Sequence, residues 1–237
     1  MKMCGRFFIA EEGEDELLTM MIEEASRRQQ AIVGESAIAK GEVFPSATVA
    51  ALAMGKHGNV GAFPFQWGFH RADHKGLIIN TRSETALEKP IFRASMQERR
   101  CLIPCSWYFE WETRDGQESM LDGISSLQIQ QESVSKTHRQ NIQKIKYAIR
   151  PKQKGLMYLA AIYRFEDSQR LPLLSILTRD AAKEIAFIHD RMPVIFSDRT
   201  RAEWLNRAAD PCAVLNDCEK EMVYTRGAAE PDRSGCI

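Results

Sequence analysis

The apolar residues of this chain come in short runs, and this pattern limits the fold more than any other feature. Residues 43–53 and 58–69 are apolar runs broken by glycines and prolines, which indicates strands joined by turns. Further strands are predicted at 77–79, 101–111, 144–150, 156–163, 171–178 and 192–196. Helices are predicted at 13–30, 83–88, 91–98 and 198–207, with another that Thr178 caps and that ends near His189. The pattern predicts an α+β fold, with a curved, barrel-like mixed or antiparallel β-sheet and peripheral helices.

The length of 237 residues suits a single large domain. We expect this domain to span 1–225, with a loose tail at 226–237. The polar stretch 116–143, rich in Gln and Ser, is predicted to leave the core as an excursion. Without a run of about 18 apolar residues or a secretory signal, the chain is expected to be cytoplasmic, with no membrane partner.

Charge is balanced overall but uneven along the chain. The formal net charge is zero, which is unusual for a nonspecific duplex binder. Residues 11–24 are strongly acidic, whereas 136–154 carries seven Lys or Arg and no Asp or Glu. The basic stretch is either a solvated hairpin or a rim that attracts phosphates, and both interpretations stay open.

The cysteines predict neither a disulfide framework nor a metal site. They lie at positions 4, 101, 105, 212, 218 and 236. No pair has the CxxC spacing, and no histidine is placed to complete a zinc knuckle. We therefore expect buried small apolar side chains, no structural metal and no cofactor.

Cys4 stands in the sequence MKMCGRF, directly after Met3. A cysteine near the start of a chain is most often incidental, but this one gains a free α-amine if translation begins at Met3 and that methionine is removed. An α-amine has an ordinary pKa of about 7.7–8.0, so part of it is neutral near pH 7. The amine can form an imine with an aldehyde, and the thiol can then close a five-membered ring. An internal Cys4 cannot do this.

Four further polar residues are candidates for chemistry. Asn80 and Arg82 are two positions apart, so both could point from a strand end toward one site and bind an amine and a phosphate; alternatively, this segment only starts a helix. Glu110 lies among aromatic residues, where partial burial favours its protonated form and suits proton transfer; alternatively, it is an exposed strand residue. His189 follows a predicted helix, whose C-terminal end favours a protonated imidazole; alternatively, it is structural.

Several short segments together resemble one protein family. They are CGRF at 4–7, WG at 67–68, NTRSET at 80–85, RRCLIP at 99–104, YFEW at 108–111 and HDRMP at 189–193. In this order they resemble the SOS-response-associated peptidase (SRAP) family of abasic-site processing proteins, over residues 4 to about 207. The resemblance implies a single α+β domain with a positively charged groove for single-stranded DNA. It also implies that Cys4, once N-terminal, forms a thiazolidine with the ring-opened abasic sugar.

The resemblance also implies roles for individual residues. Asn80 would orient the Cys4 amine, Glu110 would move protons, and His189 would help to open the sugar ring and permit slow reversal. The residues that would contact DNA are Arg6 and Arg82, at phosphates, and Pro45 and Trp67, packed against the flanking bases.

Three features depart from the family pattern. The family's Asn-Ala-Arg is here Asn80-Thr81-Arg82, which is a tolerable change. Met1 and Lys2 precede the expected Met-Cys start, and the chain cannot form the crosslink if all three leading residues persist. The excursion at 116–143 is longer than the family needs.

Three functions compete at this stage. The first is a covalent crosslinker of abasic sites with lyase-like activity, acting in the DNA damage response. The second is a thiol peptidase, or autopeptidase, that uses Cys4; the third is a noncatalytic single-strand DNA-binding module. For the first, the expected partner is single-stranded DNA with abasic sites. We expect a monomer that associates with the nucleoid when bound to DNA and needs no protein partner.

Overall fold

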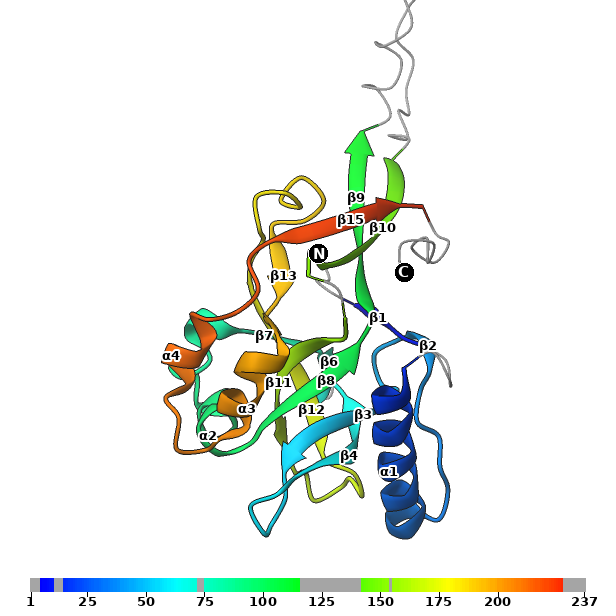
Figure 1. The fold of residues 1–237 in the computed structure, drawn as a ribbon, viewed down its shortest axis with the longest axis vertical. Coiled ribbons are helices and arrows are strands. Elements are labelled where there is room, and N and C mark those ends of the chain that lie inside the picture. The colour runs from blue at the N-terminus through cyan, green and yellow to red at the C-terminus, as the bar shows by residue number, and fades with distance from the viewer. Residues whose placement is uncertain (1–4, 11–14, 72–74, 116–141, 154, 228–237) are drawn as a thin grey trace, which may run out of the picture.

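The computed structural model describes residues 5–10, 15–71, 75–115, 142–153 and 155–227, and Figure 1 shows how their elements are arranged. The strands are β1 (Arg6–Ile9), β2 (Gly41–Val43), β3 (Thr48–Met54), β4 (Val60–Trp67), β5 (Phe69–His70), β6 (Leu77–Ile78), β7 (Asn80–Arg82), β8 (Arg100–Cys105), β9 (Trp107–Asp115), β10 (Ile142–Pro151), β11 (Met157–Arg164), β12 (Leu173–Asp180), β13 (Arg191–Pro193), β14 (Ile195–Phe196) and β15 (Met222–Arg226). The helices are α1 (Glu16–Val33), α2 (Pro90–Glu98), α3 (Asp198–Leu205) and α4 (Pro211–Leu215), and a 3-10 helix spans Ser83–Thr85. The predicted α+β class is confirmed.

Five strands of the larger sheet close into a ring. In the order β12, β4, β3, β8 and β11, each strand pairs with the next, and β11 pairs back to β12. The pairing of β12 with β4 is parallel and the other four are antiparallel, so the sheet is mixed. Core side chains such as Leu102 and Leu174 are fully buried, as expected where side chains fill a small barrel. The predicted barrel-like sheet is confirmed.

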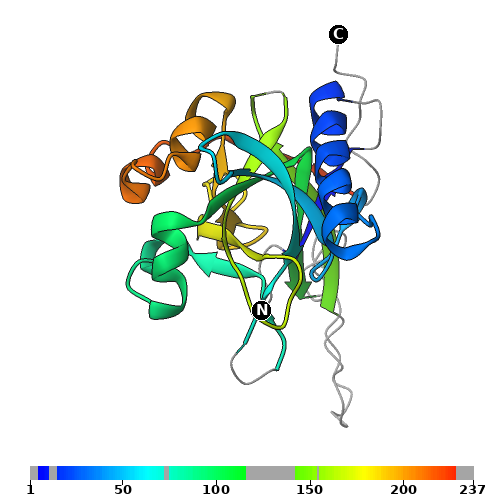
Figure 2. The same ribbon diagram turned by 90° about the horizontal axis from the view of Figure 1, so that it is seen from below.

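Helix α1 covers β3 and β4 with one apolar face. Figure 2 shows α1 on one side of the ring and the shorter helices on the other. Leu18, Met21, Ile22 and Ala25 are buried on this face, as their helical spacing predicts. Leu17, which the same pattern placed with them, is 44% exposed. The Asp15 carboxylate accepts a hydrogen bond from the Leu18 N–H at 3.0 Å and so caps the helix start.

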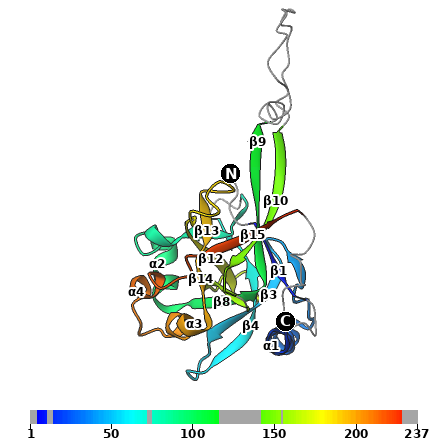
Figure 3. The ribbon, with the colours of Figure 1, turned by 45° about the horizontal axis from the view of Figure 1, so that its top comes forward.

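A second sheet has the order β15-β10-β9-β1-β2, and β9 and β10 form its long antiparallel hairpin (Figure 3). The two faces of β9 differ, as its alternating sequence predicts. Trp107 and Phe109 pack with Phe8 and Ala148 in a separate apolar cluster, whereas Tyr108 joins the main core. Glu110 shares the Tyr108 face because side chains two positions apart on a strand point the same way.

The helix predicted to end near His189 is wrong. Thr178 lies inside β12, and β12 pairs with β13, so both ends of the segment between them are held by an antiparallel ladder. The segment instead forms turns, with hydrogen bonds from Ile185 N–H to Ala182 O and from Ile188 N–H to Ile185 O. The argument that a helix end favours a protonated His189 therefore does not apply.

Other strand boundaries also differ from the prediction. The strand predicted at 101–111, where Pro104 suggests a break, is indeed divided in two, but Pro104 lies within β8 opposite Tyr158 and the interruption comes at Ser106. Strands β10 and β11 do not form a hairpin, since β10 pairs with β9 and β15 in one sheet while β11 belongs to the ring. Helix α4 and strands β1 and β15 were not predicted. Most of the 116–143 excursion and of the 226–237 tail lies outside the described residues.

Candidate functional site

A pocket of about 540 Å³ opens where β1 begins. Its walls come from the start of β1, the segment after β2, the β9–β10 hairpin and the loop between β12 and β13. The lining residues are Gly5, Arg6, Phe44, Pro45, Ile79, Glu110, Trp111, Thr113, Lys144 and His189. Four residues that the sequence singles out, Arg6, Pro45, Glu110 and His189, therefore meet in one place. Cys4 lies outside the described residues, but its neighbour Gly5 forms part of the wall.

Glu110 reaches the pocket from β9 with only 3% of its surface exposed. Its cross-strand partner on β10 is Tyr147. A carboxylate so largely removed from water is a candidate for exchanging protons with a ligand in the pocket.

His189 reaches the same pocket from the loop between β12 and β13, and it is 7% exposed. Its Nδ1 accepts the Arg191 N–H at 3.0 Å, and it also lies 2.8 Å from the Asp190 carboxylate. The contact with the Arg191 N–H requires Nδ1 without a proton, whereas the contact with the Asp190 carboxylate requires Nδ1 with a proton. We favour the backbone contact, because the Asp190 side chain is 82% exposed and such a pair contributes little. The ring proton then lies on Nε2, which is buried and has no hydrogen-bond partner in the described part of the chain.

Two cations, Arg6 of the pocket wall and Lys146 of β10, share one carboxylate, Glu42. Arg6 Nη1 donates to Glu42 Oε1 at 2.9 Å, and Lys146 Nζ lies 2.9 Å from each Glu42 oxygen. Burial disfavours the charged form of Glu42, but the hydrogen bonds from Lys146 and Arg6 outweigh it and hold its pKa below the usual value. Arg6, predicted to bind a phosphate, is thus already paired.

A second carboxylate, Glu112, lies next to the lining residue Thr113. Glu112 accepts hydrogen bonds from Arg114 Nε at 2.5 Å and from the Tyr147 hydroxyl at 2.7 Å. The hydrogen bond from Arg114, opposed by burial and assisted by Tyr147, lowers the pKa of Glu112. Arg114 and Tyr147 therefore hold Glu112 in its ionised form.

Asn80 and Arg82 lie on β7, which pairs in parallel with β12. Thr81 between them is buried and its hydroxyl bonds Ser175 at 2.8 Å, so Asn80 and Arg82 share the opposite face, as predicted. Asn80 is half-buried beside the lining residue Ile79, and Arg82 is exposed. Neither is among the residues that line the described pocket.

The prediction that Trp67 packs against DNA bases is wrong. Its side chain is fully buried in the core, and its Nε1–H donates to the Ile79 carbonyl at 3.0 Å. Trp67 packs against Phe7 at a ring-centroid distance of 5.0 Å. Trp67 therefore packs beneath β1, the strand that contains Phe7, and has no exposed ring face that a base could contact.

The sequence reasoning missed several residues of the site. Phe44 and Trp111 line the pocket and contact the Arg6 guanidinium. Glu42 forms an ion pair with Arg6 and a second one with Lys146. The sequence offered one signal for Phe44, because an aromatic residue directly before a proline in a turn can lie at the surface. In the structure Phe44 is 48% exposed. Nothing in the spacing of Glu42 and Lys146 reveals that they meet.

The cysteine predictions are confirmed in part. Cys101, Cys105 and Cys218 are buried and free, whereas Cys212 is exposed, against expectation. Burial raises the pKa of the Cys101 and Cys105 thiols well above the usual value, so both are inert. Within the described ranges, no group of His, Cys, Asp and Glu could hold a metal ion, and no helix is long and apolar enough to cross a membrane.

Comparison with known proteins identifies the family. The pattern of the SOS response associated peptidase (SRAP) family matches residues 3–226. Abasic site processing protein YobE of Bacillus subtilis is 28% identical over 227 residues, covering 88% of this chain and 85% of that protein. Abasic site processing protein HMCES of Rattus norvegicus is 27% identical over 162 residues, covering 61% of this chain and 44% of that protein.

Solved structures share the fold. A protein from Bacteroides thetaiotaomicron superposes with a TM-score of 0.65 at 20% identity, covering 94% of this chain and 91% of that one. A phage-related protein from Bordetella bronchiseptica gives a TM-score of 0.63 at 15% identity, covering 96% and 95%. With the family pattern matched over nearly its whole length, the chain belongs to the SRAP family.

Proposed function

We propose that this protein processes abasic sites in single-stranded DNA by forming a covalent bond through Cys4. One observation carries the proposal: Gly5, which follows Cys4, lines the same pocket as the buried Glu110 and His189. The names of the related abasic site processing proteins agree with it.

The chemistry joins two groups of Cys4 to one carbon. The neutral α-amine attacks the aldehyde carbon of the ring-opened deoxyribose, and the carbinolamine loses one water to give an imine. The sulfur then bonds to the imine carbon, and the thiol proton passes to the nitrogen, which closes a thiazolidine. One water leaves in total, and no oxidant or reductant is needed.

The surrounding residues supply proton transfer and binding. Glu110 accepts and returns protons while the carbinolamine forms and collapses. His189, with its proton on Nε2, donates to the sugar ring oxygen as the ring opens. Asn80 orients the amine, and Arg6 and Arg82 bind phosphates beside the lesion.

Pro45 and the half-exposed Phe44 are the residues of the pocket wall suited to contact the flanking bases. This assignment replaces the one made for Trp67.

The proposal requires that Cys4 carries a free α-amine. The polypeptide must therefore start at Met3 and lose that methionine, or lose its first three residues later. An intact-mass measurement of protein isolated from cells gives the true N-terminus. A chain that keeps Met1, Lys2 and Met3 cannot form the thiazolidine.

The main experiment uses a single-stranded oligonucleotide with one abasic site. We expect a species that survives denaturing electrophoresis, with the mass of protein plus DNA minus one water. Cys4→Ala abolishes this species, whereas Cys212→Ala, which removes an exposed thiol outside the pocket, retains it. Binding that vanishes on denaturation would support the noncatalytic DNA-binding module instead. Loss of the leading residues without any adduct would support the autopeptidase.

Two further variants test the proton-transfer roles. Glu110→Gln keeps the side-chain shape and is expected to slow adduct formation by about 10²- to 10⁴-fold. His189→Ala is expected to slow reversal of the adduct, measured by the release of DNA after dilution into competitor. An unchanged rate in either assay removes that residue from the mechanism.

A further inference from the structure

Glu42 pairs with two cations, Arg6 of the pocket wall and Lys146 of the neighbouring strand β10. Arg6 Nη1 lies 2.9 Å from Glu42 Oε1, and Lys146 Nζ lies 2.9 Å from both carboxylate oxygens. One negative charge thus faces two positive charges, so this group of three keeps a net positive charge. Two donors that converge on two oxygens of one group form a geometry that also suits a phosphate.

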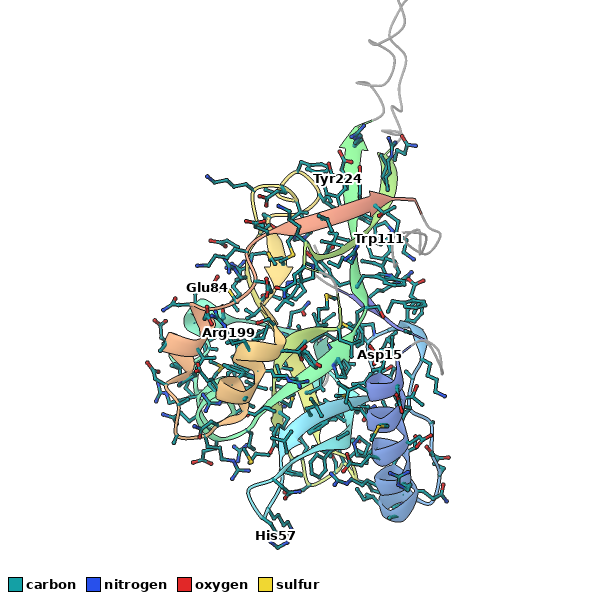
Figure 4. All side chains as sticks on the ribbon, in the orientation of Figure 1. Asp15, His57, Glu84, Trp111, Arg199 and Tyr224 are labelled. Atoms are coloured by element: carbon teal, nitrogen blue, oxygen red, sulfur yellow. The ribbon has the colours of Figure 1, made fainter. Side chains whose placement is uncertain are left out.

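Aromatic rings hold both cations independently of Glu42. The Arg6 guanidinium carbon lies 4.4 Å from the Phe44 ring centroid and 5.0 Å from that of Trp111. Trp111, a residue of β9, is labelled in Figure 4. Lys146 Nζ lies 3.8 Å from the Phe109 ring centroid. Because these cation–π contacts position the two side chains, the cations keep their places when another anion replaces Glu42.

Partial burial limits the access of dissolved anions to Arg6 and Lys146. The Lys146 side chain is 15% exposed, Glu42 is 29% exposed and Arg6 is 38% exposed. Against the effect of burial, the two hydrogen bonds keep the pKa of Glu42 below its usual value, so the carboxylate is ionised near neutral pH. An incoming anion therefore competes with Glu42 for Lys146.

We propose that Arg6 and Lys146 form a phosphate subsite that Glu42 occupies in the free protein and that a backbone phosphate of single-stranded DNA takes over. The identity of the ligand rests on the proposed function. The subsite adds Lys146 as a phosphate ligand and makes Glu42 a resident competitor that weakens the binding of DNA. Glu42 thereby favours the binding of DNA strands that also make contacts inside the pocket.

The test measures binding of an undamaged single-stranded oligonucleotide by fluorescence anisotropy at several salt concentrations. For Glu42→Gln we expect a slope of log Kd against log salt that is steeper by about 0.7, the value for one phosphate on a single strand. In the variant, the charge neutralised on that phosphate is no longer offset by the release of the Glu42 carboxylate. Relative to 1 M salt, that slope gives about 8-fold tighter binding near 50 mM salt. Glu42→Asp, which keeps the charge but is too short to reach both cations, is expected to show a smaller gain.

Controls separate the subsite from a general charge effect. Glu221→Gln removes the same charge from an exposed pair with Lys152 and is expected to leave the slope unchanged. Adding Lys146→Gln to Glu42→Gln is expected to cancel the gain. The proposal is overturned if Glu42→Gln binds DNA no tighter than Glu221→Gln, or more weakly than the wild type, since Glu42 would then only position Arg6.

The denaturing gel with abasic DNA distinguishes this outcome from failure of the proposed function. If the wild type forms the adduct but Glu42→Gln gains no affinity, the subsite is wrong and the function stands. If Glu42→Gln gains affinity but the wild type forms no adduct, the subsite stands and the covalent function is wrong.

Discussion

The hydrogen bond between Tyr147 and Glu112 gives a prediction that can be worked through from the structure. The Tyr147 hydroxyl donates to Glu112 Oε2 at 2.7 Å, and both residues are buried. Tyr147→Phe removes this donor but keeps the ring, which packs edge-on against Phe187 and Tyr224 at centroid distances of 5.8 and 5.6 Å. The change therefore isolates one hydrogen bond to an ionised carboxylate.

The expected loss at neutral pH is about 1.5–3 kcal/mol of unfolding free energy, the usual range for a hydrogen bond to a charged group. For a chain of this size, that loss lowers the thermal midpoint by about 3–12 °C. The loss depends on pH, because the folded state lowers the pKa of Glu112, chiefly through Arg114 and also through Tyr147. A lowered folded-state pKa gives stability that is complete above the unfolded value of about 4.3 and disappears as the pH falls through the folded value.

The assay is equilibrium urea unfolding at about pH 7 and about pH 3, with the free energy extrapolated to zero urea. We expect the difference between wild type and Tyr147→Phe to shrink toward about 0.5–1.5 kcal/mol as the pH falls and Glu112 takes up its proton. Tyr163→Phe is the matched control: this tyrosine is also nearly buried, and its polar surroundings include Arg207 and Arg99, so its effect should not depend on Glu112. Equal losses at both pH values for Tyr147→Phe would refute the reasoning.

Three other changes have defined outcomes. Trp67→Ala is expected to lower the unfolding free energy by about 3–5 kcal/mol through the cavity that it leaves, while the folded variant binds intact single-stranded DNA with unchanged affinity; weaker binding by fully folded protein would restore a role in stacking. A maleimide is expected to label Cys212 in the native protein, whereas Cys101, whose thiol pKa is raised by burial, is labelled only after unfolding, as peptide mass mapping can show. Asp15→Ala, which removes the cap of α1, is expected to cost about 0.5–2 kcal/mol in urea unfolding, and no change would mean that the cap is dispensable.

The errors in the sequence reasoning have a common cause. The segment before His189 has apolar residues at helical spacing, and Ile185 and Ile188 are indeed buried. It forms turns because β12 and β13 hold its ends close together, and a constraint of this kind comes from residues distant in the sequence. The error for Trp67 has the same cause. A tryptophan can lie in a core or at a surface, and which of the two occurs depends on the residues that pack around it in the fold.

The sequence by itself determined the class of fold, helix α1 and the two faces of β9, because these depend on the local period of apolar residues and on caps such as Asp15. It also named Arg6, Glu110 and His189, through motifs that stay recognisable without coordinates. Only the tertiary structure decided that these three share a pocket, and that Glu42 and Lys146, 104 positions apart, meet beside it. The physical reason is that the pairing of β1 with β2 and β9, and of β9 with β10, sets such contacts, and strand pairing at long range leaves no local signal in the chain.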